Sequence, residues 1–281
     1  MNIISAQKIG FLKFDGPIKA TIGYLILCNN YFSFPLPQTL LTMSWKKSLP
    51  FFIWQSIKYF KSPSQFIQNW SYYSRWVDSF KQGRNSVSDE LPWLNYPAIE
   101  FLRQINLSKY KVFEYGGGGS TLFFCKSAAH VSTVEDHEGW FQTLSETINQ
   151  KGYTKWEGHF RKPEIYTGKK IRSKENPDDF MSGGKGRENY TFENYVKVIE
   201  GYQPEYFDII LVDGRARPSC IKLAIPHLKQ GGYLIIDNTE RNYYLTYFKK
   251  FLAKQFIQEL RTTAPVNYTP DFTQTTILRK L

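Results

Sequence analysis

Four consecutive glycines, residues 116–119, follow an apolar run that contains the carboxylate of Glu114, in the stretch KVFEYGGGGSTLFF. Glycine loses more conformational freedom on folding than any other residue, so four of them after an expected strand need a physical reason. A turn of bare backbone lets a ligand lie directly against the chain, because no Cβ atom stands in the way. Gly116, Gly118 and Ser120 alternate in this turn, and we expect them to line a ligand site.

A second carboxylate lies about 20 residues further along the chain, the separation typical of nucleotide-binding α/β units. Glu135 is the first acidic residue after the apolar run HVSTV, and Asp136 follows it. A carboxylate at the end of the second strand can accept hydrogen bonds from the hydroxyls of a ribose. The two features together predict a nucleoside-containing cofactor. Which of the two carboxylates faces the ribose stays open.

The residues around the glycines argue against a cofactor bound through phosphates. A dinucleotide loop has the spacing GxGxxG, but position 121 holds Thr. No GK[ST] sequence follows the glycines, which disfavours a nucleoside triphosphate. Glu114 places a negative charge immediately before the loop, where it would repel a pyrophosphate and attract a cationic ligand.

Two later apolar runs also end in oxygen-bearing side chains. Asp213 follows FDIILV, and Asp237 and Asn238 follow GGYLII. These side chains could converge on Mg²⁺, which prefers oxygen ligands and would lower the pKa of a bound acceptor hydroxyl. They could equally line a metal-free acceptor pocket, in which Asp213 contacts the cofactor and takes part in catalysis while Asp237 contacts the acceptor.

Four further residues are candidates for contact with an acceptor or for proton transfer. Arg215 and Arg217 are too basic to release a proton readily, so we expect them to bind an acidic acceptor. His137 has a usable pKa and could act as a base, with an exposed position at a helix start as the alternative. Tyr190 could border the acceptor site, after a long charged insertion, residues 167–189, that we expect to form a lid.

The segments that carry these residues alternate between strand-like and helix-like patterns. The expected strands are 111–116, 130–135, a weakly marked one within 157–166, 206–214 and 231–238, with a hairpin within 256–281. The expected helices are 96–105, 120–129, 138–150, 191–202, 218–230 and 243–256. This alternation predicts an α/β fold with a doubly wound, mostly parallel seven-stranded sheet, whose ligands bind at the carboxyl ends of the strands.

Residues 1–90 have a different composition from residues 91–281, being irregular, rich in aromatic residues and interrupted by prolines such as Pro35 and Pro37. One helix is expected here, with Ser64 as its cap and Gly83 as its end. We therefore divide the chain into a mainly helical N-terminal extension, 1–90, which caps a cofactor-binding domain, 91–281.

The overall composition indicates the cellular environment of the protein more clearly than its function. The net charge of +11 suits nucleic acid, an anionic membrane surface or an acidic substrate, and could equally serve solubility. Cys28, Cys125 and Cys220 are isolated, which argues against a disulfide scaffold or a structural zinc site. No run reaches the roughly 18 apolar residues of a membrane span, and no signal-peptide pattern is found. We expect a cytoplasmic protein, and its oligomeric state stays open.

In these motifs the sequence resembles the class I S-adenosylmethionine-dependent methyltransferases. The resemblance covers residues 95–281 and rests on FEYGGGGST, VSTVEDHEGW, FDIILVDGRAR and GGYLIIDNTER, in the family's order. The family motif E/DxGxGxG appears as Glu114, Gly116 and Gly118, with Ser120 in place of the last glycine. The resemblance implies S-adenosyl-L-methionine as the cofactor, with its cationic methionine part near Glu114 and its ribose held at Glu135.

The sequence is also similar in part to the divalent-metal-dependent O-methyltransferases of the catechol and caffeoyl type. In those enzymes an Asp after the fourth strand and an Asp-Asn pair after the fifth bind the metal, which matches Asp213, Asp237 and Asn238. They also carry a lysine, thought to be the base, three residues after the first Asp, where this sequence has Ala216. That departure puts the metal and the base in doubt.

Other functions compete with this interpretation. Nucleic-acid amino-methyltransferases carry [DN]PP[YF] after the fourth strand, where this chain reads DGRA, and cytosine-C5 enzymes need a Pro-Cys pair that RPSC separates. A nucleic-acid acceptor is therefore disfavoured, with ribose methylation of RNA left open. An NAD-type oxidoreductase and a non-catalytic interaction protein would share the architecture. We predict O-methylation of a small-molecule or sugar hydroxyl.

Overall fold

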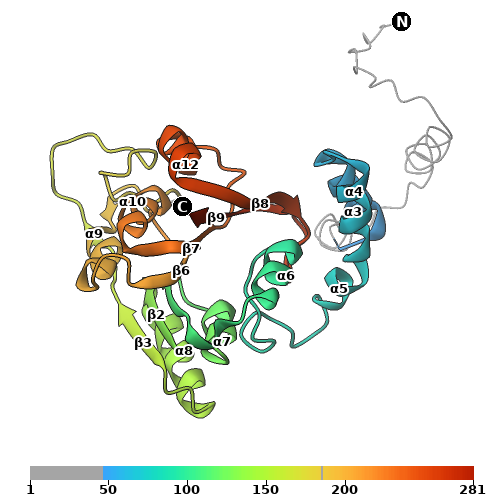
Figure 1. Ribbon diagram of the computed structural model, residues 1–281, viewed down its shortest axis with the longest axis horizontal. Helices are drawn as coiled ribbons and strands as arrows, with labels where there is room; N and C mark the ends of the chain where they lie inside the picture. The colour runs from blue at the N-terminus through green and yellow to red at the C-terminus, as the bar shows by residue number, and fades with distance from the viewer. Residues whose placement is uncertain (1–46, 185) are drawn as a thin grey trace, which may run out of the picture. The chain divides into compact units, whose positions relative to one another are not determined.

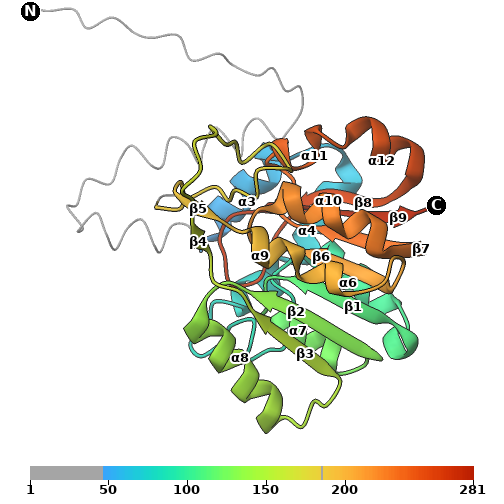
Figure 2. The same cartoon turned by 90° about the vertical axis from the view of Figure 1, so that its left-hand side faces the viewer.

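The centre of the fold is a seven-stranded sheet in the order β3-β2-β1-β6-β7-β9-β8 (Figures 1 and 2). The computed structural model describes residues 47–184 and 186–281, so Cys28, Pro35 and Pro37 lie outside the described residues. The strands are β1 (Lys111–Tyr115), β2 (His130–Glu135), β3 (Trp156–Phe160), β6 (Phe207–Val212), β7 (Leu228–Ile236), β8 (Phe256–Ala264) and β9 (Thr273–Lys280). The first five are parallel, and β9 lies antiparallel between β7 and β8. The predicted doubly wound, mostly parallel sheet is confirmed.

Helices cover both faces of this sheet, which explains why β6 is a continuous apolar run. Ile210 and Val212 of β6 enter one core, whereas Ile209 and Leu211 enter the other, because successive side chains of a strand point to opposite faces. The first core is closed by α9 (Glu193–Val196), the 3-10 helix η2 (Lys197–Gly201), α10 (Arg217–His227), α11 (Tyr243–Thr246) and α12 (Lys249–Gln255). The second is closed by α6 (Tyr96–Gln104), the 3-10 helix η1 (Leu107–Lys109) and α7 (Gly119–Cys125).

The helix α8 (Glu138–Gln150) packs on α7 through Leu144 and Ile148 and begins three residues after the glutamate that ends β2. Its bounds agree with the predicted helix. Within the part of the chain that the structure describes, no helix is long and apolar enough to cross a membrane. The insertion after β3 contains a separate two-stranded sheet, β4 (Glu164–Ile165) with β5 (Tyr190–Thr191).

Some predicted helix limits were wrong, for local reasons. The helix expected over 243–256 is divided into α11 and α12. In the N-terminal part, α4 (Pro63–Ser71) is capped by Ser62, whose hydroxyl accepts a hydrogen bond from the amide of Gln65, rather than by Ser64. Pro63 then takes the first helical position, where its missing N–H costs nothing. The following α5 (Tyr73–Asp78) ends before Gly83.

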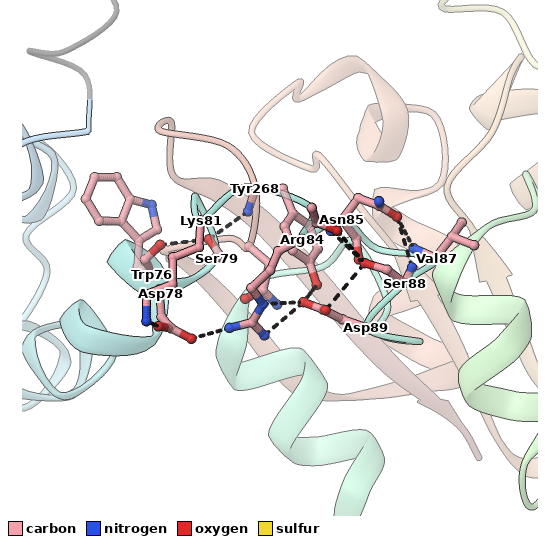
Figure 3. A network of polar contacts seen from close by, with 12 residues as sticks. Trp76, Asp78, Ser79, Lys81, Arg84, Asn85, Val87, Ser88, Asp89 and Tyr268 are labelled. Atoms are coloured by element: carbon pink, nitrogen blue, oxygen red, sulfur yellow. Dashed lines mark hydrogen bonds and ion pairs between the residues drawn. The ribbon is translucent and has the colours of Figure 1, made fainter.

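Residues 47–90 pack on the loop between β8 and β9. The ring of Phe52, in α3 (Leu49–Lys58), lies 5.1 Å from that of Phe272, and the indole of Trp76 donates to the carbonyl of Thr269. Ser79 accepts from the amide of Tyr268, whose hydroxyl donates to Asp89, as Figure 3 shows. The division at residue 90 also concerns residues 1–46, outside the described part of the chain, and stays a prediction.

Glu90 connects the end of this segment to two helices of the sheet domain. Its carboxylate pairs with Lys126 at 2.7 Å and Lys151 at 2.5 Å, and accepts from the hydroxyl of Tyr153. Burial alone would raise the pKa of Glu90, but these three donors outweigh it and lower the pKa to about 2. A carboxyl group with a lowered pKa in the folded state stabilises the fold above its unfolded pKa, and this contribution is lost as the pH falls toward 2.

We therefore expect Glu90→Gln to lower the free energy of unfolding at pH 7 by about 1 kcal/mol, since partly exposed ion pairs contribute little individually. The loss should shrink as the pH falls from about 4.5 to about 2, where the native carboxyl is itself protonated. Urea denaturation at several pH values measures this. Exposed Glu146, which has no ion pair among the described residues, gives the matched control Glu146→Gln. An effect of Glu90→Gln that does not vary with pH would contradict the assignment.

Candidate functional site: a cavity at the carboxyl ends of the strands

The glycine turn after β1 is held by close backbone contacts. Gly116 has a φ of +92°, which favours glycine, and a Cβ there would lie 2.9 Å from the Cα of Gly214. Gly119 is more tightly enclosed, because a Cβ would lie 2.1 Å from the carbonyl oxygen of Ser86. The turn is thus pressed between the end of β6 and the loop that enters α6.

The sequence analysis singled out Gly116 and Gly118 at alternate positions, but the structure gives the four glycines different roles. Gly118 has extended backbone and an added Cβ would meet only Trp140, at 3.7 Å. Gly117, which the sequence left without a role, would bring a Cβ within 2.7 Å of Leu144. Packing therefore requires glycine at 117 and 119, and backbone conformation requires it at 116, whereas Gly118 faces open space.

That open space is a cavity of about 470 Å³ at the carboxyl ends of β1, β2 and β6. Most of the residues predicted for the site border it: Gly116, Gly118, Ser120, Glu135, Asp136, His137, Asp213 and Arg215. They meet because the carboxyl ends of neighbouring parallel strands lie at one edge of a sheet.

Glu135 ends β2 with its carboxylate bound to three backbone amides. One oxygen accepts from Gly117 and the other from Asp136 and His137, each at 3.0 Å. Burial raises the pKa of Glu135, and the amides offset part of this rise. Because an ionised carboxylate has about four lone-pair sites, a site for one further donor remains on the cavity side. Glu135 both fixes the glycine turn and can receive a ligand hydroxyl.

Asp136 has a different position, as the centre of an ion-pair bridge. Its oxygens lie 3.2 Å from the Nε of Arg215 and 3.3 Å from a guanidinium nitrogen of Arg187. Arg215 follows β6 and Arg187 belongs to the insertion, so Asp136 connects three segments at the rim of the cavity.

Glu114 lies beneath the glycine turn and is completely buried. One carboxylate oxygen accepts from the hydroxyl of Thr133 at 3.0 Å, whereas Oε1 has no hydrogen-bond partner. Burial raises the pKa of Glu114 to about 7. A buried oxygen without a partner is costly, and it leaves an acceptor for a cationic or proton-donating ligand group, or for a water molecule.

His137 is the N-cap of α8. Its Nδ1 accepts from the amide of Trp140 at 3.2 Å, so the neutral ring carries its proton on Nε2 and presents a donor. This geometry favours a capping role for His137 over that of a base.

Sequence reasoning missed the aromatic walls of the cavity, Trp93 and Trp140. Trp140 donates from its indole nitrogen to the carbonyl of Gly117 at 2.8 Å, so its ring stands beside the glycine turn. Trp93 is half exposed, at 51%, and lines the cavity together with Trp140. The sequence signal for Trp140 was present, since it follows Glu135 closely in VSTVEDHEGW.

A second cavity of about 330 Å³ adjoins the first and shares Trp93 and Asp213 with it. Asp237 and Asn238 line this second cavity, at the end of β7. Asp213 therefore stands between the two spaces, with one side toward the glycine turn and the other toward β7. Tyr190 packs instead on the hydrophobic core near α9.

Arg217 decides what the aspartates can bind. Its buried guanidinium donates to the carboxylate of Asp213 at 2.9 Å and to the backbone carbonyls of Asp213, Gly214 and Asp237. Asp237 accepts in addition from the hydroxyl of Thr275 at 2.6 Å. Burial raises the pKa of both aspartic acids, and the charge of Arg217 offsets part of each rise.

The arrangement does not fit the magnesium site that the sequence suggested at Asp213, Asp237 and Asn238. A divalent ion there would lie against a permanent cation, which repels it. The positive charge between the ends of β6 and β7 is that of the Arg217 guanidinium.

The chain matches no model of a known protein family and no curated protein. Solved structures do share its fold. An O-methyltransferase from Bacillus cereus in complex with SAH aligns with a TM-score of 0.50, at 15% identity, over 76% of this chain and 100% of that chain. An rRNA methylase from Streptococcus thermophilus aligns with a TM-score of 0.40 at 17% identity, over 65% of this chain and 93% of that chain. A tRNA (m1A58) methyltransferase from Aquifex aeolicus aligns with a TM-score of 0.42 at 16% identity, over 68% of this chain and 71% of that chain.

The first of these likenesses confirms the predicted Rossmann-like methyltransferase fold. The resemblance of the sequence to class I methyltransferases is thereby confirmed at the level of the fold. At such low identity the likeness leaves the reaction to be argued from the site itself.

The packing of the turn predicts different tolerances for neighbouring glycines. Gly119→Ala should lower the free energy of unfolding by about 3 kcal/mol or more, because its Cβ meets backbone that cannot move aside easily. Gly118→Ala should cost less than about 1 kcal/mol, because its Cβ points into the cavity. Denaturant unfolding of both variants tests this, and equal losses would contradict the described packing.

Proposed function

We propose that this protein is an S-adenosyl-L-methionine-dependent methyltransferase that methylates a hydroxyl oxygen of a small molecule or sugar. The observation that carries the proposal is the 470 Å³ cavity, in which the glycine turn, Glu135 and Asp213 converge and which opens beside a second cavity. A cofactor and an acceptor need two adjoining spaces of this kind.

The residues present fit the cofactor. Glu135 would receive a ribose hydroxyl at its remaining lone pair, and Trp140 and Trp93 offer flat apolar walls for an adenine ring. The unpartnered oxygen of Glu114 lies beneath the turn, from where the ionised carboxylate would attract a cationic ammonium bound above the turn. Ser120 and Gly118 would line the path between them. When bound, the cofactor supplies an electrophilic methyl group on a sulfonium.

Asp213 is the residue that we assign to the reaction centre, because it borders both cavities. In an in-line displacement the acceptor oxygen provides the electron pair of the new bond, the sulfur keeps the pair of the old bond, and the hydroxyl proton leaves. Asp213 can accept a hydrogen bond from that hydroxyl with the oxygen that Arg217 does not bind, and so orient it or take its proton. Asp237 and Asn238 would position the rest of the acceptor.

Two ion pairs support the proposed role of the insertion, residues 167–189, as a lid. Arg187 pairs with Asp136 at the cofactor cavity, and Asp178 pairs with Lys222 of α10. The insertion is thus attached at two points above the carboxyl edge of the sheet. Closing a lid there would exclude water from the reaction.

A nucleic-acid acceptor is the disfavoured alternative, since no nucleic-acid methyltransferase motif follows β6. An NAD-type oxidoreductase is disfavoured by Glu114 and by Thr121 in place of a third glycine. The cytoplasmic location is also a proposal, based on the isolated cysteines.

The cofactor assignment predicts that S-adenosylhomocysteine binds in the micromolar range and NAD does not. Glu135→Gln should weaken this binding by about tenfold or more, because a charged hydrogen-bond acceptor is lost. Calorimetric titration measures both.

Glu138→Gln, in the exposed first turn of α8, is the matched control and should bind like the wild type. Thermal unfolding identifies any Glu135 variant that fails to fold. No binding of S-adenosylhomocysteine to the wild type, or binding that is indifferent to Glu135→Gln in a folded variant, would rule out the proposal.

Because the Arg217 guanidinium supplies the positive charge beside Asp213 and Asp237, we expect methyl transfer to be insensitive to the chelation of metal ions. A screen with radiolabelled S-adenosyl-L-methionine against phenols, sugars and small acids should give the same rates with and without EDTA. Loss of activity in EDTA, restored by added Mg²⁺, would reinstate a metal at Asp213 and Asp237.

A further inference from the structure

A third, smaller cavity of about 50 Å³ adjoins the 470 Å³ cofactor cavity and shares Gly214 and Arg215 with it. Four cationic side chains border it: Lys174, Arg215, Arg217 and Arg241. The described residues that line it also include Ser182 and Tyr243, and none of them is a carboxylate.

The cations come from three segments that are far apart in the sequence. Lys174 belongs to the insertion, Arg215 and Arg217 follow β6, and Arg241 follows β7. The insertion lies against the segment that follows β7, since a Cβ on Gly183 would lie 3.5 Å from the Tyr243 hydroxyl. The fold therefore brings this charge together around one small space.

The positive charge in this cavity exceeds the negative charge around it. Arg217 is paired with Asp213, and Arg215 with Asp136. Lys174 and Arg241 have no ion pair among the described residues. The ammonium of Lys174 lies 5.1 Å above the ring of Tyr243, and Arg241 donates to the hydroxyl of Tyr244 at 2.8 Å. Lys174 and Arg241, which have no counterion among the described residues, thus border a space that the buried guanidinium of Arg217 also lines.

We propose that this cavity binds an anionic group of the methyl acceptor, either a phosphate, a sulfate or a carboxylate. The proposal rests on the proposed methyltransferase function and names its acceptor class. Clustered like charges repel one another, and an anion offsets that repulsion while accepting charge-assisted hydrogen bonds from arginine. The anion-binding site lies next to Gly214, so an acceptor held there extends toward Asp213 and the cofactor cavity.

The size of the cavity favours a small acceptor over a polynucleotide. A volume of about 50 Å³ admits one group of a few heavy atoms, because a single water molecule needs roughly 10–15 Å³ on the same measure. The contact of the insertion with Tyr243 closes the space on one side. A chain of phosphates requires a continuous basic groove instead.

Titration with inorganic phosphate at constant ionic strength tests the site directly. The wild type should bind phosphate in the millimolar range or more tightly, and the double variant Lys174→Gln/Arg241→Gln should bind at least about tenfold more weakly. Arg241→Lys keeps the charge and should bind more tightly than Arg241→Gln. Lys250→Gln, on the exposed surface of α12, is the matched control and should bind like the wild type.

S-adenosylhomocysteine binding provides the independent measurement. Retained binding by the double variant shows that it is folded, so a loss of phosphate binding then belongs to the anion site. Absence of phosphate binding in the wild type, or equal binding by the folded double variant and the wild type, overturns the anion site. Phosphate binding without any S-adenosylhomocysteine binding leaves the anion site and removes the methyltransferase function.

A comparison of acceptors tests the assignment in turnover. Among matched pairs such as glucose and glucose 6-phosphate, or catechol and its carboxylated derivative, the wild type should prefer the anionic member by about tenfold in kcat/KM. The preference should disappear in the double variant. Preference for the neutral members, or displacement of phosphate by an oligonucleotide and by no small anion, would overturn a small anionic acceptor.

Discussion

The guanidinium of Arg217 is the interaction on which the arrangement of this site depends. It is buried where β6 and β7 end, and four of its hydrogen bonds reach Asp213, Gly214 and Asp237. A buried charge is tolerated only when it is paired and its donors are satisfied, and the backbone carbonyls at these strand ends provide the partners. The buried charge of Arg217 makes a second cation nearby costly. Its hydrogen bond to the carboxylate of Asp213 holds that residue between the cavities of about 470 and 330 Å³. The same side chain contributes to the excess positive charge of the smallest cavity.

The glycine turn is the second constraint, and it acts through space rather than charge. Ser86 of the preceding segment and Gly214 after β6 approach its backbone so closely that side chains cannot be accommodated. Glu135 then fixes the turn through the amide of Gly117, and Trp140 fixes it through the carbonyl of the same residue. Because both polar groups of Gly117 are bound, the turn is restrained, and this favours a cavity that needs little ordering when a ligand binds. A preformed cavity lowers the ordering cost of binding.

Much of this site could be predicted because parallel strands end at one edge. Glu135, Asp136 and Asp213 were recognised as acidic residues that follow apolar runs, and the alternation of strands with helices required those runs to be neighbours. The final antiparallel hairpin was predicted as well, but a hairpin fits either order of its strands, and only the structure places β9 between β7 and β8. Helix limits were less accurate at α4, where Ser62 competes with Ser64 as a cap and the choice depends on one hydrogen bond.

The sequence by itself determined the sheet, the glycine turn and the row of carboxylates, because these depend on local periodicity and on the ends of strands. Only the tertiary structure decided what those carboxylates face. Arg217 reaches back from the first turn of α10 to Asp237, 20 residues away, and Lys174 and Arg241 meet across the insertion and the end of β7. Such pairings between distant residues leave no periodic trace in a sequence. Packing determines which charges of the site interact, because the electrostatic energy depends on distance in space and not on separation along the chain.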